Sequence, residues 1–252
     1  MILNNETGKI LYMANFFFFH MVGKPVWRQK SSIMKRRGAL IVVEGVDRSG
    51  KSTQCNLLTQ SLKARNYTVQ KANFPDRTTA IGNIIDQYLK QEIKLTDEAV
   101  HLLFSANRWE KMHEIQKSLA EGTTWIIDRY SYSGIIFSSI KKNMSFDWCK
   151  MPESGLPEPD LTFLLMVDDE TLAQRPGFGN EIYEKTEIQR KVKHLFKKVY
   201  NFEPTWEIID ASKSKEEVHD KMLDLVIQKI REVEYKPLKF LKFLPDKNIL
   251  SY

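Results

Sequence analysis

The feature that most constrains the fold is an eight-residue stretch at residues 45–52, Gly-Val-Asp-Arg-Ser-Gly-Lys-Ser. It directly follows an apolar run at residues 39–43 and precedes a stretch with helical periodicity. The spacing G-x-x-x-x-G-K-S between a strand and a helix is that of the P-loop, in which backbone N–H groups and a helix N-terminus surround a phosphate. The sequence therefore predicts that the chain binds a nucleoside triphosphate.

Four side chains of this loop have expected roles. Lys51 is expected to reach the β- and γ-phosphates, and the Ser52 hydroxyl is expected to ligate Mg²⁺. Arg48 lies inside the loop, where its guanidinium could stabilise the γ-phosphate during transfer, and Asp47 could accept a hydrogen bond from a sugar hydroxyl. The alternative for Arg48 and Asp47 is that both are solvated loop residues.

Short apolar runs like that at residues 39–43 recur along the chain and alternate with helical patterns. The other expected strands are residues 124–127, 161–167 and 206–209, with a weaker, alternating candidate at 67–74. Expected helices include residues 54–64, 96–109 and 215–230. Because alternating strands and helices form βαβ units, we expect an α/β chain with a three-layer P-loop NTPase fold. Its central parallel sheet would have about five strands flanked by helices, with a mobile lid.

The net charge of +6 lies entirely in the N-terminal segment. Residues 1–37 hold seven basic side chains and one acid, Glu6, so the rest of the chain is formally neutral. A neutral body lacks the basic surface of a nucleic-acid-binding protein, and the apolar stretch at residues 11–22 is too short to span a bilayer. We therefore expect no nucleic-acid partner and no membrane partner. The expected organisation is an N-terminal leader or disordered extension (1–35), a catalytic domain (36–232) and a C-terminal tail (233–252).

The leader leaves three alternatives open. It is a targeting segment, the result of a start codon assigned too early, or a tail without a role. The two cysteines, Cys55 and Cys149, lie in no metal or disulfide pattern, which favours a reducing compartment. The expected location is the cytoplasm, with the nucleus as an alternative, or the mitochondrion if residues 1–35 act as a leader.

Charged residues follow two of the expected strands at the edge where open α/β sheets bind ligands. Asp128 and Arg129 end the strand at 124–127, and Arg77 lies in the turn Phe-Pro-Asp-Arg at 74–77. Asp128 has the position of the Walker-B carboxylate that helps to hold Mg²⁺, and both arginines could bind a phosphate. Surface ion pairs and a solvated arginine are the alternatives.

Two further features indicate a second substrate. Phe104 and Arg108 are four residues apart on an expected helix, so one could stack on a base while the other bonds its carbonyl. The alternative is that Phe104 belongs to the core. The polar connection at residues 168–184, with Arg175 at its centre, is long enough for a mobile lid, although part of it could be helical.

Together these segments resemble the thymidylate kinase family of P-loop nucleoside monophosphate kinases, over about residues 36–230. An arginine within the P-loop, as at Arg48, resembles the eukaryotic type. The stretch His-Leu-Leu-Phe-Ser-Ala-Asn-Arg-Trp-Glu at 101–110 is the most diagnostic. The other matching segments are residues 37–41, 44–48, 74–77, 128–130 with Ser133 and Gly134, 155–157 and 159–161.

The resemblance implies roles for matching positions. Catalysis would depend on Arg48, Lys51, Asp128 and Arg129, with Ser52 and Asp128 as the metal site. ATP would contact Gly45, Arg48, Ser49, Gly50, Lys51, Ser52, Thr53 and Arg175, the last over the adenine. The monophosphate dTMP would contact Asp47, Phe74, Arg77, Phe104, Arg108, Arg129, Gly134, Phe137, Tyr183 and Gln189. In this set Phe104 would stack on thymine, while Phe137 and Tyr183 would leave little room for a 2′-hydroxyl.

The expected reaction is transfer of the γ-phosphate of ATP to dTMP, giving dTDP and ADP for dTTP synthesis, with Mg²⁺ as cofactor and a homodimer as the implied assembly. One departure from the family concerns the lid, where Ile182-Tyr183-Glu184 replaces the common Arg-Tyr-Glu. This departure leaves open a nucleotide-binding protein with impaired catalysis. The other open alternative is another nucleoside monophosphate kinase, acting on UMP, CMP or AMP.

Overall fold

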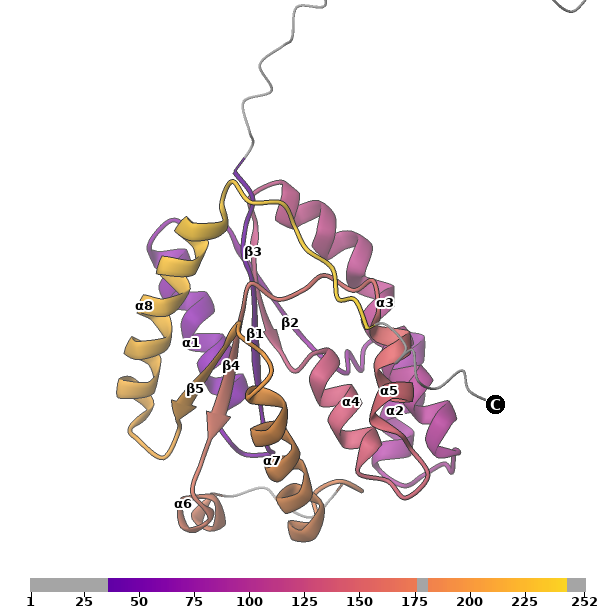
Figure 1. Cartoon of the computed structure of the whole chain (residues 1–252). Coiled ribbons are helices and arrows are strands. Elements are labelled where there is room, and N and C mark those ends of the chain that lie inside the picture. Colours follow the sequence, from indigo (N-terminus) through magenta and orange to yellow (C-terminus); the bar gives the residue numbers. More distant parts are fainter. Residues whose placement is uncertain (1–35, 176–180, 244–252) are drawn as a thin grey trace, which may run out of the picture. The chain divides into compact units, whose positions relative to one another are not determined.

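The computed structural model describes residues 36–175 and 181–243, and these contain a five-stranded parallel sheet covered by helices on both faces (Figure 1). The strand order is β2-β3-β1-β4-β5, so the P-loop strand lies in the centre. The strands are β1 (Leu40–Gly45), β2 (Val69–Asn73), β3 (Thr124–Asp128), β4 (Leu161–Met166) and β5 (Trp206–Asp210). The predicted fold class and all five predicted strands are confirmed.

The burial of the strands and their residue types explain how clearly each strand could be predicted from the sequence. In β1 and β3 every residue is buried, because helices cover both faces, and both read as continuous apolar runs. The edge strands β2 and β5 bury only their first and fourth residues. β5 still reads as an apolar run because its exposed positions include Ile208, whereas those of β2 are Gln70, Lys71 and Asn73, which explains the weaker pattern at 67–74.

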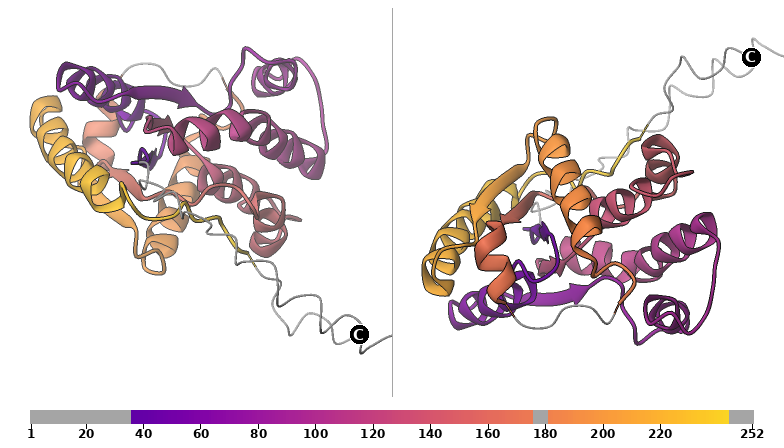
Figure 2. Two further views of the ribbon diagram at one scale, coloured as in Figure 1. Left: turned by 90° about the horizontal axis from the view of Figure 1, so that it is seen from above. Right: turned by 90° about the horizontal axis from the view of Figure 1, so that it is seen from below.

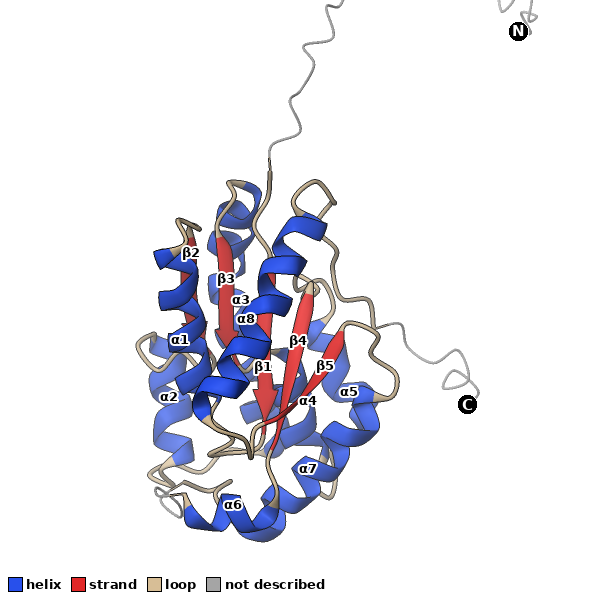
Figure 3. Cartoon of the chain, turned by 90° about the vertical axis from the view of Figure 1, so that its left-hand side faces the viewer, coloured by secondary structure: helices blue, strands red, loops and turns tan. Residues whose placement is uncertain are grey.

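The helices form two layers (Figure 2). On one face α1 and α8 lie side by side, in front of the sheet in Figure 3. They pack Leu58, Leu62 and Met222 against Ile41 and Phe163. Helices α3, α4, α5 and α7 lie on the other side (Figure 1). The helices are α1 (Lys51–Ala64), α2 (Ala80–Leu89), α3 (Asp97–Ala120), α4 (Ser131–Ser139), α5 (Phe146–Lys150), the 3₁₀ helix η1 (Met151–Glu153), α6 (Asp169–Gln174), α7 (Thr186–Tyr200) and α8 (Lys215–Val233).

Helix starts follow local capping chemistry. Thr96 accepts a hydrogen bond from the Ala99 N–H and is followed by two acids, so α3 begins where the sequence predicted. It then continues to Ala120, beyond the predicted end at residue 109. Helix α8 begins with a reciprocal capping box between Ser214 and Glu217.

The chain after α8 turns back along the body. Residues 238–243, here called the C-terminal strap, run antiparallel to the loop at residues 155–158 through a bridge between Phe240 and Pro157. The Leu241 N–H donates to the Leu156 carbonyl at 2.8 Å, and the Leu241 carbonyl accepts from the Gly155 N–H at 2.9 Å. Leu241 itself is buried. Part of the predicted tail is therefore packed on the domain.

Three of the expectations from the sequence concern segments that the structure does not describe. The leader at residues 1–35, the middle of the lid at 176–180 and the end of the tail at 244–252 lie outside the described residues. Among the residues that the structure does describe, no helix combines the length and apolar character needed to cross a membrane.

Candidate active site

The P-loop lies at the carboxyl end of the central strand β1 and leads directly into α1. Gly50 has a φ of 95° at the helix N-cap, a conformation that glycine adopts without strain. The Lys51 ammonium is buried and donates to the Val46 carbonyl at 2.6 Å. Burial, followed by the Arg129 charge, lowers the pKa of Lys51 to about 8, while nearby carboxylates, chiefly Asp128, act in the opposite direction. The amine is therefore mostly charged at neutral pH.

A donor-side pocket opens over this loop. It brings the predicted residues Arg48, Ser49, Gly50, Lys51, Ser52, Thr53 and Arg175 together with Ala211, Lys213 and Lys215. Gly45 does not line this pocket, and its carbonyl accepts from Arg129 Nη1 at 3.2 Å. The Arg175 guanidinium donates to the Arg48 carbonyl at 2.6 Å and to the Ala211 carbonyl at 2.7 Å. The Arg48 guanidinium in turn donates to the Arg175 carbonyl, so these two arginines join the P-loop to the start of the lid.

Ser52 and Asp128 lie in contact beside the loop, where the Ser52 hydroxyl donates to the carboxylate of Asp128. A hydroxyl and a carboxylate are the oxygen ligands with which proteins hold Mg²⁺ next to substrate phosphates. Their side-by-side placement fits the predicted metal site. No cluster of three or more His, Cys, Asp and Glu side chains that could hold a metal ion occurs among the described residues.

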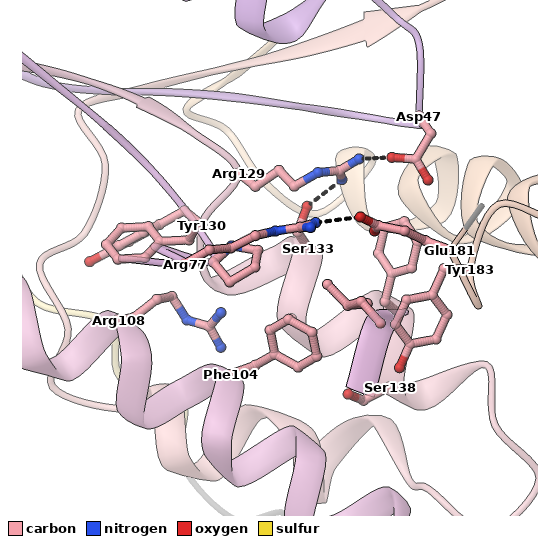
Figure 4. A pocket seen from close by; sticks show the side chains of 15 residues that line it. Asp47, Arg77, Phe104, Arg108, Arg129, Tyr130, Ser133, Ser138, Glu181 and Tyr183 are labelled. Carbon is pink, nitrogen blue, oxygen red and sulfur yellow. Dashed lines mark hydrogen bonds and ion pairs between the residues drawn. The ribbon is translucent and has the colours of Figure 1, made fainter. Parts of the chain in front are cut away.

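Arg129 lies between the donor-side pocket and a second pocket, which is described below. Its backbone has a φ of 65°, and its N–H donates to the Val43 carbonyl at 3.0 Å. Its guanidinium bonds Ser133 Oγ at 3.1 Å and pairs with the Asp47 carboxylate (Figure 4). This carboxylate also accepts from the Gln189 side chain.

Below this junction, Glu44 is buried at the end of β1. It accepts hydrogen bonds from the backbone N–H groups of Tyr130 and Ser133, at 3.0 and 3.1 Å, and from the Ser133 hydroxyl. Burial raises the pKa of Glu44, against the effects of Ser133 and Arg129. Glu44 thus fixes the start of α4, which follows Arg129.

The second pocket, here called the acceptor pocket, contains all the residues predicted to contact the acceptor except Gln189 (Figure 4). Phe104 and Arg108 extend from α3 into the same space, and Arg77 and Arg129 lie at the opposite side. Gln189 lies behind Asp47, where it accepts from the Asp47 N–H at 2.8 Å and donates to the Tyr183 carbonyl at 2.9 Å. It therefore links the P-loop to the wall of the pocket without lining it.

Arg108 is held at the base of this pocket by a buried ion pair. Its Nε donates to Glu153 Oε2 at 2.8 Å, and its Nη2 donates to the other carboxylate oxygen of Glu153. Gly134 lies against this guanidinium, and a Cβ at position 134 would come within 2.4 Å of Arg108 Nη2. The predicted Gly134 therefore leaves room for Arg108.

Arg77 lies at the other end of the pocket in two ion pairs. Its guanidinium nitrogens lie 2.6 Å from Asp86 Oδ1 on α2 and 2.7 Å from Glu181 Oε1 at the end of the lid. The turn that carries Arg77 is anchored by Asn107 on α3, which accepts from the Asp76 N–H at 2.7 Å and donates to the Asp76 carbonyl at 3.1 Å. Helix α3 thus supports both ends of the pocket.

An aromatic wall closes the pocket near α4. The rings of Phe137 and Tyr183 meet edge to face with centroids 5.4 Å apart, and Tyr88 packs behind Tyr183 at 6.4 Å. The Lys141 ammonium lies 5.5 Å from the Tyr183 ring centroid. Burial, with the neighbouring Tyr88, raises the pKa of Tyr183, so its hydroxyl stays protonated.

The described part of the lid agrees with the helical alternative. Residues 169–174 form the short helix α6, which is the helical alternative, while residues 176–180 lie outside the described residues. At position 182, Ile182 joins the apolar cluster that includes Ile85 and Leu89, and its N–H donates to the Leu89 carbonyl at 3.0 Å. The replacement of the family's arginine by isoleucine is therefore matched by an apolar surface on α2.

Sequence reasoning missed several supporting residues. Glu44 and Asn107 lie in the matching segments and Lys141 lies outside them, and the roles of all three depend on which elements pack together. Glu153 follows Met-Pro in a segment without periodicity in the sequence, so no local signal indicated that it would be fully buried. Glu181 lies in the lid, where its contact with Arg77 depends on the loop path.

Comparisons with known proteins agree with this geometry. The family model described as Thymidylate kinase matches residues 43–222. The chain is 49% identical to the Schizosaccharomyces pombe thymidylate kinase, with 76% of this chain and 93% of that protein aligned. It is 44% identical to the Homo sapiens thymidylate kinase, covering 81% and 96%. A solved structure of thymidylate kinase from Candida albicans superposes with a TM-score of 0.74 at 39% identity, covering 82% of this chain and 99% of that one.

Proposed function

Because this chain belongs to the thymidylate kinase family, we propose that it transfers the γ-phosphoryl group of ATP to the phosphate of dTMP, giving ADP and dTDP. The observation that carries this proposal is the arrangement of two pockets around one cluster of cations. A third hollow is lined by Lys51, Arg48 and Arg129. It shares lining residues with both the donor-side pocket and the acceptor pocket. A donor phosphate and an acceptor phosphate would therefore meet beside these positive charges.

The reaction needs no general base. The second pKa of a phosphate monoester is about 6, so the attacking phosphate oxygen is already mostly ionised at neutral pH. The protein therefore acts by holding donor and acceptor in line and by neutralising charge on the transferring group. Lys51 and Arg48 extend from the same loop, which fixes their positions relative to the donor phosphates.

The acceptor phosphate would bind between Arg129 and Arg77. Arg129 is already fixed by Ser133 and by the Asp47 carboxylate. Arg77 is paired with Asp86 and Glu181, so an incoming phosphate would compete with these carboxylates for the same guanidinium. Exchange of Glu181 for phosphate would connect acceptor binding to the end of the lid.

Ser52 and Asp128 would hold the Mg²⁺ that accompanies ATP. When bound, the ion supplies positive charge to the β- and γ-phosphate oxygens. The Ser52 hydroxyl and the Asp128 carboxylate are adjacent and oxygen-based, which suits this ion.

The base and sugar of dTMP would lie in the acceptor pocket. Phe104 offers a ring face for stacking, and the Arg108 guanidinium offers only hydrogen-bond donors, which suit a base carbonyl better than an amino group. The edge-to-face contact of Phe137 with Tyr183 gives a filled wall beside the sugar. This wall favours a deoxyribose over a ribose.

We also propose that the chain forms a homodimer through α3 and α5. Leu102 and Trp109 are seven residues apart on α3, so they share a face, and each is at least 40% exposed. Trp148 and Met151 are also exposed and lie beside them, since the Trp148 ring contacts His101 and Trp109 donates to the Pro152 carbonyl. A second copy of the chain would cover this apolar surface.

The proposal is tested by measuring both products in one reaction. Purified chain, ATP, Mg²⁺ and dTMP should give dTDP and ADP in equal amounts, and omission of dTMP should nearly abolish ADP formation. Lys51→Met should lower the rate by at least about a hundredfold because it removes a cation from the transfer site. Tight binding of ATP and dTMP without dTDP formation would instead support a nucleotide-binding protein with impaired catalysis.

A further inference from the structure

The ion pair between Arg108 and Glu153 differs from the other ion pairs around the acceptor pocket in its burial. Arg108 is 2% exposed and Glu153 is fully buried, whereas Arg77 and its partners are partly exposed. Both carboxylate oxygens of Glu153 are engaged, one with Nε and one with Nη2 of Arg108. This two-point contact fixes the plane of the guanidinium as well as its position.

Glu153 is itself held rigidly against α3. It ends the 3₁₀ helix η1, and the preceding Pro152 carbonyl accepts from Ser105 Oγ at 3.0 Å and from Trp109 Nε1 at 2.8 Å. Ser105 and Trp109 lie on either side of Arg108 along α3. The carboxylate is therefore placed beside Arg108 by contacts that do not involve Arg108.

The remaining surroundings leave the guanidinium little freedom. A Cβ at position 134 would lie 2.9 Å from Arg108 Nη1, so Gly134 brings the α4 backbone close to the guanidinium on the pocket side. Phe104 lies beside the guanidinium in the same pocket (Figure 4). An arginine alone loses considerable side-chain freedom when it binds a ligand, and a side chain that is already ordered avoids much of that cost.

We propose that Glu153 is a positioning residue for base recognition, which holds the Arg108 guanidinium in the orientation that meets the carbonyl of a pyrimidine base. Glu153 does not touch the substrate in this arrangement and acts only through Arg108. The proposal rests on the proposed function, since it concerns how the same site selects dTMP.

The direct test is Glu153→Gln, which keeps the shape of the side chain and replaces one acceptor oxygen by a donor that faces the guanidinium. The KM for dTMP is expected to rise about tenfold or more, while the KM for ATP stays unchanged and kcat stays within about threefold. Glu203→Gln is the control, because Glu203 is also a carboxylate bonded to a side chain, that of Tyr132, but is only partly buried and lies outside the two substrate pockets. It should leave both KM values unchanged.

A merely structural role of Glu153 would give a different result. A folded Glu153→Gln variant with unchanged KM for dTMP, or with a reduced kcat alone, would overturn the proposal. If Glu153→Gln does not fold, Glu153→Asp decides, because it keeps the charge on a shorter side chain: a rise in the KM for dTMP supports the proposal, and an unchanged KM overturns it.

A double variant tests whether the effect passes through Arg108. Arg108→Met combined with Glu153→Gln should have the same KM for dTMP as Arg108→Met alone, and a further rise would show that Glu153 acts by another route and would overturn the proposal. Failure of the proposed function is separately visible, since the unmodified chain would then not form dTDP at all.

Discussion

At the scale of single residues, two strained arginines stand at the centre of the site. Arg48 and Arg129 have φ values of 60° and 65°, a region that residues other than glycine adopt at a cost of about 1–3 kcal/mol. The surrounding bonds hold both residues there, with the Arg129 N–H bonded to the Val43 carbonyl. Both arginines line the hollow between the two pockets.

Arg48→Ala tests the catalytic part of this arrangement. The substitution keeps the Cβ and hence a similar backbone strain, while it removes the positive charge that we propose lies beside the γ-phosphate. We expect kcat to fall by about a hundredfold or more with little change in the KM for dTMP. Steady-state kinetics on both substrates give the result, and an unchanged kcat would remove Arg48 from the catalytic group.

His101 provides a prediction about pH. It is fully buried, its Nε2 donates to the Cys149 carbonyl at 3.0 Å, and its Nδ1 accepts from Ser138 Oγ at 2.8 Å. Burial, reinforced by the Arg108 charge, lowers the pKa of His101 from its ordinary value of 6.5. Below pH 6.5 the unfolded chain therefore binds a proton that the folded chain does not, and the stabilising effect of the neutral ring is lost as pH falls through the folded-state pKa.

Urea unfolding at pH 7.5 and pH 5.5 measures this effect. The free energy of unfolding should be lower at pH 5.5, and His101→Gln should show a smaller difference between the two pH values. A part of the difference will remain, because burial also lowers the pKa of His219. An equal difference in both proteins would mean that His101 does not contribute.

At the scale of secondary-structure elements, α3 organises the acceptor pocket. Successive turns of this helix present His101 to α4 and α5, Phe104 and Arg108 to the pocket, and Asn107 to the turn that carries Arg77. This explains why the whole stretch from residue 101 to 110 carried the family resemblance. Several of its residues each support a different neighbouring element.

The sequence predicted those elements whose signal is local. The P-loop spacing and the fully buried strands follow from short-range patterns, and the residues of the acceptor pocket followed from the family resemblance. Glu153 and the C-terminal strap could not be predicted in the same way, because their partners are distant in sequence. The sequence predicts only an appended tail here, and its contact with the loop at 155–158 shows that Leu241 is a core residue.

Removal of the strap should therefore affect both stability and acceptor binding. A chain that ends at residue 237 loses the burial of Leu241 and the backbone bonds to residues 155–158, which begin two residues after Glu153. We expect the free energy of unfolding to fall by about 2 kcal/mol or more and the KM for dTMP to rise.

The matched control is a chain that ends at residue 243 and keeps the whole strap. It isolates the contribution of residues 238–243 from that of the residues beyond them. Thermal melting and dTMP kinetics compare the two chains. If they melt together and have equal KM values, the strap has no part in holding this loop.

At the scale of the whole molecule, the charge distribution and the apolar surface indicate different partners. The net charge of +6 belongs to the N-terminal segment, while the arginines proposed to bind substrate lie within a formally neutral body. The exposed apolar residues on α3 and α5 are the part of the surface that a second copy of the chain would cover. Under the two proposals, charge would act locally in the site, and association would depend on apolar contact.

Sedimentation analysis tests this association. The unmodified chain should sediment as a dimer, and Leu102→Asp should give a monomer, because a charge at the centre of the apolar surface would be buried without a partner. Phe202→Asp is the control, since Phe202 is 83% exposed in the loop after α7. A monomeric unmodified chain, or an unaffected Leu102→Asp dimer, would contradict the proposed interface.

The central claim is that the pocket formed by Phe104, Arg108, Phe137 and Tyr183 selects thymidylate for phosphorylation at the P-loop. The most direct test is kcat/KM for dTMP and for UMP, measured side by side with the same preparation and saturating ATP·Mg²⁺. We expect a preference for dTMP of about a hundredfold or more, because the wall formed by Phe137 and Tyr183 would oppose the 2′-hydroxyl of UMP and the acceptor pocket would accommodate thymine. Equal efficiency on the two substrates, or a preference for UMP, would contradict it.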